Sequence, residues 1–155
     1  MVLQNLFKER TDKVFIIAEI GNNHNGCLER AFAMVDEACA TGVDCVKFQI
    51  RNLQALYRKR SLNKSGEDLG TEYIIDLLNK FELSHDDHKK LKDYCDLKGI
   101  TYMCTPWDNE SIELLESWKV PSYKVASADL TNEFLIHRLL KTKKPLILST
   151  GMSSE

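Results

Sequence analysis

Short apolar runs of strand length alternate with segments of helical periodicity along the whole chain. The runs cover residues 14–20, 43–50, 100–105, 121–126 and 145–150. Between the first two runs, apolar residues recur at the spacing of one helix face: Leu28, Ala31, Phe32, Val35 and Ala38. Strands that alternate with helices form right-handed βαβ units, so the sequence predicts a parallel sheet and an α/β fold.

Helices are also predicted in the second half of the chain. One covers residues 72–81, whereas the polar and basic residues 51–70 before it indicate a loop. Ser84 followed by Asp87 forms a capping-box signature that opens the next helix, and Gly99 ends it. The expected N-caps of the last two helices are Asp108 and either Thr131 or Asn132.

The type of α/β fold follows from motifs that are missing. No G-x-G-x-x-G follows the first strand and no G-x-x-x-x-G-K-[ST] occurs. The absence of these phosphate-binding motifs argues against the doubly wound nucleotide-binding folds. A TIM-type (β/α) barrel remains, although a complete one has eight strands in about 250 residues. We therefore expect an N-terminal extension over residues 1–13 and a partial barrel, its first five βα units, over 14–155.

Charge and cysteine content restrict the function. Lys and Arg number 21 against 23 Asp and Glu, a net charge of −2, which argues against a nucleic-acid partner. No apolar run approaches the roughly 20 residues of a membrane span, and no signal-peptide core precedes residue 14. Five cysteines without a C-x-x-C pair predict free thiols. We expect a cytoplasmic protein without a membrane partner.

Polar side chains gather where the predicted strands end. They are Glu19, Lys47, Gln49, Thr105, Lys124, Ser127 and Ser149. Alternation with period two places Lys47 and Gln49 on one face with Cys45, and Glu19 on one face with Ile17. An apolar lower layer followed by a polar residue at the carboxyl end is the pattern of a barrel interior, whose active site lies at that end.

Lys47 and Lys124 are both expected to face the interior, where their positive charges require negatively charged partners. An unpaired buried ammonium costs several kcal/mol, and Glu19 supplies only one negative charge. The remainder must come from an anionic ligand, or the lysine pKa values must fall. A phosphorylated carboxylic acid would satisfy both lysines, and the hydroxyls would bind its oxygens. Alternatively, Glu19 and Lys47 form a structural ion pair and the hydroxyls satisfy backbone groups.

Five sequence blocks carry a family resemblance. They are IIAEIGNNHNG, VKFQI, DYCDLKGITYMCTPWD, VPSYKVASADLTN and KPLILSTGM, in this order. Together they resemble the N-acetylneuraminate (sialic acid) synthase family, which includes legionaminate and pseudaminate synthases and spore-coat polysaccharide relatives. The resemblance runs from about residue 14 to the end of the chain, and it implies the N-terminal part of a TIM barrel.

The resemblance also implies an activity. Members condense phosphoenolpyruvate with the aldehyde of an N-acetylhexosamine such as N-acetylmannosamine, giving a nine-carbon 2-keto acid for surface carbohydrate synthesis. A divalent metal, manganese or magnesium, polarises the aldehyde, and its histidine ligands come from strands beyond this chain. The full-length family enzyme is a homodimer in which a C-terminal antifreeze-like domain, also absent here, caps the partner's site.

Roles for the polar residues follow from the matching motifs. The resemblance implies that Lys47, Thr105, Lys124, Ser127 and Ser149 hold phosphoenolpyruvate, while Glu19 and Gln49 contact the sugar. Glu19, Lys47 and Lys124 would be the catalytic residues.

The histidines leave alternatives open. His24 matches the family's first loop and is a candidate substrate-binding residue, although its imidazole could instead brace the turn. His85 and His88 stand at a helix start without a third ligand, so we expect them to be solvated or neutral toward the helix dipole, and not to bind a metal.

The residues 51–70 do not match the family closely enough to transfer a sugar-binding residue. Together with the absent C-terminal half, this leaves a second interpretation of the function. The chain could be a truncated, non-catalytic module that binds anions of the phosphoenolpyruvate type or associates with a full-length synthase.

Overall fold

A computed structural model of the chain describes residues 14–56, 71–151 and 153. Five parallel strands form one sheet in sequence order, with bounds β1 Ile17–Gly21, β2 Cys45–Ile50, β3 Thr101–Pro106, β4 Tyr123–Val125 and β5 Leu146–Leu148. Parallel neighbours require a crossover connection, which helices provide here. The predicted α/β fold is confirmed. The expected N-terminal extension and residues 57–70 of the predicted loop lie outside the described residues.

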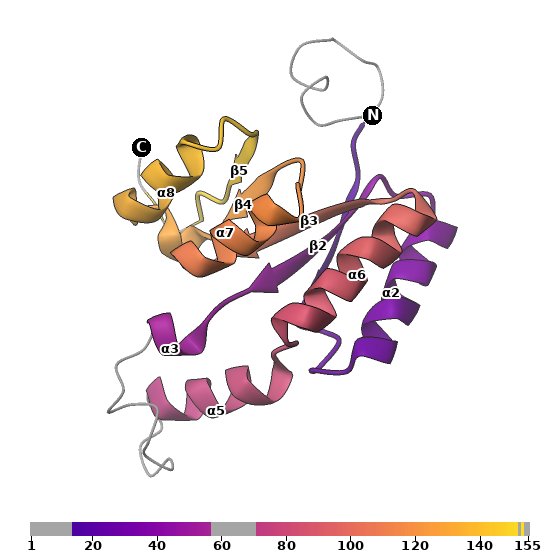
Figure 1. Cartoon of the computed structure of the whole chain (residues 1–155), viewed down its shortest axis with the longest axis horizontal. Coiled ribbons are helices and arrows are strands. Elements are labelled where there is room, and N and C mark those ends of the chain that lie inside the picture. The colour runs from indigo at the N-terminus through magenta and orange to yellow at the C-terminus, as the bar shows by residue number, and fades with distance from the viewer. Residues whose placement is uncertain (1–13, 57–70, 152, 154–155) are drawn as a thin grey trace.

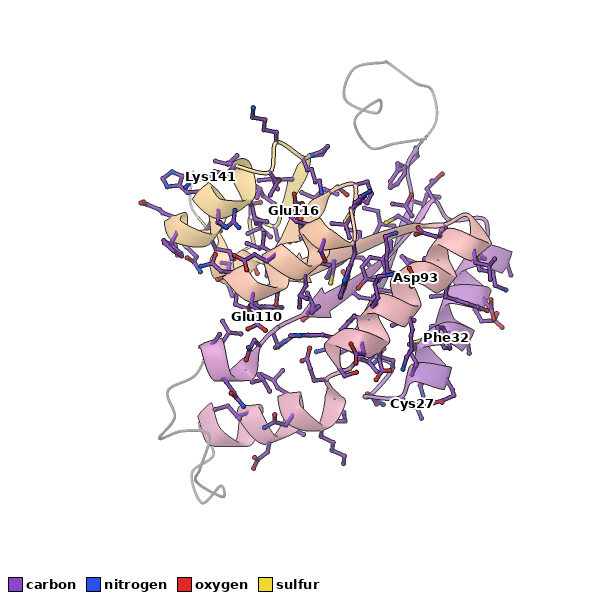
Figure 2. All side chains as sticks on the ribbon, in the orientation of Figure 1. Cys27, Phe32, Asp93, Glu110, Glu116 and Lys141 are labelled. Atoms are coloured by element: carbon purple, nitrogen blue, oxygen red, sulfur yellow. The ribbon has the colours of Figure 1, made fainter. Side chains whose placement is uncertain are left out.

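Helices cover the sheet in two pairs (Figure 1). Their bounds are α2 Leu28–Ala40, α3 Leu53–Leu56, α5 Thr71–Phe81, α6 His85–Lys98, α7 Asn109–Ser117 and α8 Glu133–Leu140, with a short 3₁₀ turn, η1, at Ser127–Asp129. The pair α2 and α6 pack together, as do α7 and α8. Phe32 of α2, labelled in Figure 2, lies against Tyr94 of α6 with ring centroids 4.6 Å apart. No helix in the described ranges is long and apolar enough to cross a membrane.

Side-chain caps start the helices where the sequence predicts. Ser84 accepts a hydrogen bond from the Asp87 N–H at 3.1 Å, and Asp108 accepts one from the Ser111 N–H at 2.8 Å. At the start of α8 the cap is Asn132, not Thr131. The helix α3 was not predicted, because its residues were assigned to a loop. Its first turn forms because the side chain of Asn52 accepts a hydrogen bond from the Gln54 N–H at 2.9 Å.

The two faces of the sheet bury different residues. The face under the helices carries a large apolar core that includes Phe48, Tyr102 and Tyr123. The opposite face carries a smaller cluster of Cys45 and Met103, with Phe15, Ile17 and Ile147 packed against it. This second cluster is the apolar lower layer that strand alternation predicts. The polar strand ends stand above it on the same face.

His88 is fully buried, so the expectation that it is solvated is wrong. Its Nδ1 lies 3.1 Å from the Tyr102 hydroxyl, and burial lowers its pKa to about 3. The imidazole is therefore neutral and shares a hydrogen bond with the Tyr102 hydroxyl. A helix-face signal was present, because His88 shares its face with the buried Leu91 and Cys95, three and seven residues later.

All five cysteines are free thiols, as predicted. Cys45, Cys95 and Cys104 are buried, and burial raises the pKa of each thiol to about 12. They behave as small apolar residues of the core and not as nucleophiles.

Candidate active site

A cavity of about 370 Å³ opens at the carboxyl ends of the strands. Seven of the eight predicted site residues line it: Glu19, Lys47, Gln49, Thr105, Lys124, Ser127 and Ser149. They come together because the register of the sheet aligns Glu19 with Lys47 and Gln49 with Thr105. The cavity lies near the lower end of the roughly 300–1,000 Å³ range of small-ligand sites.

Lys47 forms an ion pair with Glu19. Its Nζ lies 2.9 Å from Oε1 and 2.8 Å from Oε2 of the carboxylate. The Lys47 side chain is only 8% exposed, whereas that of Glu19 is 55% exposed. The buried ammonium is therefore compensated, and the carboxylate keeps a free face toward solvent and toward any ligand in the cavity.

Lys124 has no carboxylate partner among the described residues. Its Nζ donates to the Val125 carbonyl at 2.7 Å and to the Ser149 hydroxyl. Burial lowers the pKa of Lys124, and the Lys47 ammonium lowers it further, against the opposing effect of Glu19. The two lysines are thus close enough for their charges to interact. The positive charge of Lys124 is not balanced by a carboxylate in the described part of the chain.

The hydroxyl of Thr105 is buried at the cavity without a hydrogen-bond partner among the residues that the structure describes. Thr105 is 1% exposed, and its Oγ1 has no hydrogen-bond partner within the described part of the chain. The same holds for Nε1 of Trp107, which also lines the cavity. A buried polar atom without a partner costs about 1–3 kcal/mol, so these atoms favour a site that is completed by a bound polar group.

His24 is the predicted site residue that does not line the cavity. Its side chain is buried against Phe48, at a centroid distance of 6.2 Å, and its Nδ1 accepts a hydrogen bond from the Gly26 N–H at 3.1 Å. Burial lowers the pKa of His24, which keeps the ring neutral. This geometry corresponds to the loop-bracing role that the sequence left open, not to contact with a ligand.

Five lining residues were not singled out in the sequence: Gly21, Asn22, Asn23, Trp107 and Ala126. All of them lie close in sequence to a predicted site residue. Gly21 to Asn23 follow Glu19, Trp107 follows Thr105 by two positions, and Ala126 directly precedes Ser127. Gly21 has a φ of +55°, and a Cβ there would lie 3.1 Å from the Glu19 carboxylate. A positive φ and a crowded carboxylate together require glycine.

The described residues contain no group of three or more His, Cys, Asp and Glu side chains that could hold a metal ion. The donor set of the cavity is cationic and hydroxylic apart from Glu19, so these residues alone do not fit a divalent cation. The manganese or magnesium ion that the family resemblance implies stays a prediction.

A parallel α/β sheet whose strand ends surround a cavity of lysines and hydroxyls is the arrangement of a TIM-type barrel. Residues 34–155 match the NeuB family model, and the chain belongs to the NeuB family. It is 37% identical over 143 residues to the N,N'-diacetyllegionaminic acid synthase of Legionella pneumophila, covering 89% of this chain and 40% of that protein. It is 33% identical over 164 residues to the N-acetylneuraminate-9-phosphate synthase of Drosophila melanogaster, covering 99% and 42%.

Solved structures agree on the fold. A sialic acid synthetase from Leptospira borgpetersenii superposes with a TM-score of 0.78 at 31% identity, covering 92% of this chain and 46% of that one. A 3-deoxy-D-arabino-heptulosonate 7-phosphate synthase from Thermotoga maritima, at 13% identity and a TM-score of 0.57, shares the fold alone. The chain spans about two fifths of the length of the curated relatives that it matches.

Proposed function

We propose that this chain supplies the phosphoenolpyruvate-binding part of a sialic acid-type synthase, which serves the synthesis of surface carbohydrates. Its substrates would be phosphoenolpyruvate and the open-chain aldehyde of an N-acetylhexosamine such as N-acetylmannosamine. The observation that carries the proposal is the convergence of Lys47 and Lys124 with hydroxyl groups on one cavity. The printed names of the relatives, a legionaminic acid synthase and an N-acetylneuraminate-9-phosphate synthase, agree with it.

The proposed reaction forms a carbon–carbon bond and breaks the carbon–oxygen bond to phosphate. The enol carbon of phosphoenolpyruvate attacks the aldehyde carbon, and the aldehyde oxygen takes up a proton to become a hydroxyl. Water adds to the resulting oxocarbenium carbon and releases a proton. The carbon–oxygen bond to phosphate then breaks and phosphate leaves with the bonding electrons. The hydroxyl on the same carbon releases its proton, and a 2-keto acid remains.

The residues of the cavity are complementary to the charged groups of the proposed reaction. Lys47 and Lys124 would bind the phosphate and carboxylate and stabilise the charge that develops as phosphate leaves. Thr105, Ser127 and Ser149 would donate hydrogen bonds to the same oxygens. Glu19 would accept a hydrogen bond from the sugar.

Two parts of the proposed enzyme lie beyond the described residues. A manganese or magnesium ion would polarise the aldehyde when bound, by ligands outside this chain. A second copy of the full-length protein would complete a homodimer.

The test is phosphate release by the full-length protein from phosphoenolpyruvate and N-acetylmannosamine. Lys47→Met and Lys124→Met should each lower kcat/KM by roughly 10²–10³, the usual effect of removing one such donor. Lys92→Met is a matched control, because Lys92 is a buried lysine on α6, pairs with Asp96 at 2.5 Å and does not line the cavity. Its loss should leave turnover unchanged.

The same experiment separates the two functions that the sequence leaves open. Binding of phosphoenolpyruvate without turnover in the wild type would favour the non-catalytic module. Turnover that survives both cavity substitutions would overturn the proposed role of the lysines.

A further inference from the structure

Arg51 lies directly after β2 and does not line the cavity, although it contacts residues that do. Its side chain is 6% exposed, and its Nη2 donates to Oε1 of Gln49 at 2.6 Å. The guanidinium carbon lies 5.0 Å from the centroid of the Trp107 ring. Gln49 and Trp107 both line the cavity, whereas Arg51 does not. Arg51 therefore supports two lining side chains from behind.

The contact with Arg51 fixes which end of the Gln49 amide faces the cavity. A guanidinium group has only donors, so it can pair with the amide oxygen but not with the amide nitrogen. The NH₂ group is left on the side of Gly21, where a Cβ would lie 3.5 Å from Gln49 Nε2 and 3.1 Å from Glu19 Oε1. A donor and an acceptor thus converge on the same stretch of the cavity wall.

Glu82 in turn holds Arg51. Its Oε2 lies 3.2 Å from the Arg51 Nε, and the two side chains are 15% and 6% exposed. Glu82 follows α5 and comes from a part of the chain remote from β2, so the pair joins two separate segments. Burial raises the pKa of Glu82 to about 7, although Arg51 opposes this effect. Arg51 therefore contacts a carboxyl group, a ring face and an amide oxygen at once.

We infer that Arg51 is a positioning residue that sets the Gln49 amide so that its NH₂ group donates to an oxygen of the acceptor sugar. The inference rests on the proposed function and deepens it. Together, Glu19 and Gln49 would select an acceptor that presents a hydroxyl donor beside an acceptor oxygen. A lysine cannot replace the arginine, because a single flexible ammonium lacks the planar fork that reaches Glu82 and Gln49 together.

A double-mutant cycle in the full-length protein tests the inference. The variants are Arg51→Lys, Gln49→Met and the double substitution, with KM and kcat measured for N-acetylmannosamine and for phosphoenolpyruvate separately. Each single variant should raise KM for the sugar about tenfold, the effect of one lost hydrogen bond, and leave KM for phosphoenolpyruvate unchanged. Arg51→Lys should have no further effect once Gln49 is Met.

Two outcomes would overturn the inference. One is a pair of fold-changes that multiply in the double variant, which would mean that Arg51 acts independently of Gln49. The other is an equal rise of KM for both substrates, as expected of a general structural role. Failure of the proposed function is distinguishable, because the wild type would then release no phosphate from phosphoenolpyruvate.

A second measurement avoids variants that fail to fold. The side-chain ¹⁵N–¹H resonances of Gln49 report its amide directly, and they are assigned by their loss in Gln49→Met. In the wild type, we expect two well-separated proton signals that exchange slowly with water and shift when N-acetylmannosamine is added in the absence of phosphoenolpyruvate. Averaged, rapidly exchanging signals, or signals that do not respond to the sugar, would contradict the role assigned to Arg51.

Discussion

Glu19 and Lys47 face each other in register on β1 and β2, and their ion pair of 2.8 Å joins an open carboxylate to a buried ammonium. The sequence predicts this ion pair as the structural alternative to a ligand site. It neutralises one of the two cavity lysines and leaves Lys124 without a carboxylate among the described residues. The ion pair and the proposed anion site therefore coexist, because the pair accounts for only one positive charge.

The first prediction concerns Glu19. Glu19→Gln removes the negative charge beside Lys47, so the affinity for phosphoenolpyruvate should rise several-fold while turnover falls about a hundredfold. Calorimetric titration and phosphate release measure the two effects. Asp93→Asn is the control, because it removes the same charge from an exposed pair on α6, labelled in Figure 2. An equal rise in affinity in the control would mean that only the overall charge matters.

The second prediction concerns the pH dependence of binding. Burial and Lys47 lower the pKa of Lys124, and an anion binds better to the ammonium than to the neutral amine. Affinity for phosphoenolpyruvate should therefore fall as pH rises through this lowered pKa, before the range in which ordinary lysines titrate. Arginine stays charged, so the fall should move to higher pH in Lys124→Arg. An identical pH profile in both proteins would exclude Lys124 as the titrating group.

The third prediction concerns stability in acid. Burial lowers the pKa of His88 to about 3, whereas the histidine titrates near 6.5 in the unfolded chain. Between these values the unfolded chain binds a proton that the native protein does not, so stability falls as pH decreases from 6.5 toward 3. One such group contributes at most about 1.4 kcal/mol per pH unit. The difference in urea-unfolding free energy between the wild type and His88→Gln should shrink over this range, and a constant difference would contradict a buried neutral ring.

The fourth prediction compares two helix caps. Asp108 accepts hydrogen bonds from the Ser111 N–H, the Ser111 hydroxyl at 2.9 Å and the Asn52 N–H at 2.6 Å. Asn132 caps α8 through the Leu135 N–H alone at 3.2 Å. Asp108→Ala should cost about 3 kcal/mol of unfolding free energy and Asn132→Ala about 1 kcal/mol. Equal costs in urea unfolding would show that Asp108 acts only as a cap.

Strand positions and seven site residues were predictable because both depend on local patterns. Alternation with period two placed Cys45 and Met103 in the inner layer and Lys47 above them. The carboxyl ends of parallel strands necessarily meet at one edge, so polar residues there were expected to converge.

The remaining features depend on packing between segments that are distant in sequence. Burial of His88 requires Tyr102 of β3, and the loop-bracing position of His24 requires the ring of Phe48. The Arg51–Glu82 pair joins segments on either side of α5. Apart from the helix-face position of His88, no local pattern predicts these contacts, because the two partners lie in different segments of the chain.

Calorimetric titration of the full-length protein with phosphoenolpyruvate is the most direct test of whether the cavity of Lys47 and Lys124 binds this ligand. We expect saturable binding at one site per chain, lost in the Lys47→Met and Lys124→Met double variant and retained in Lys92→Met. Absence of heat at millimolar phosphoenolpyruvate, or equal binding in the double variant, would contradict the account.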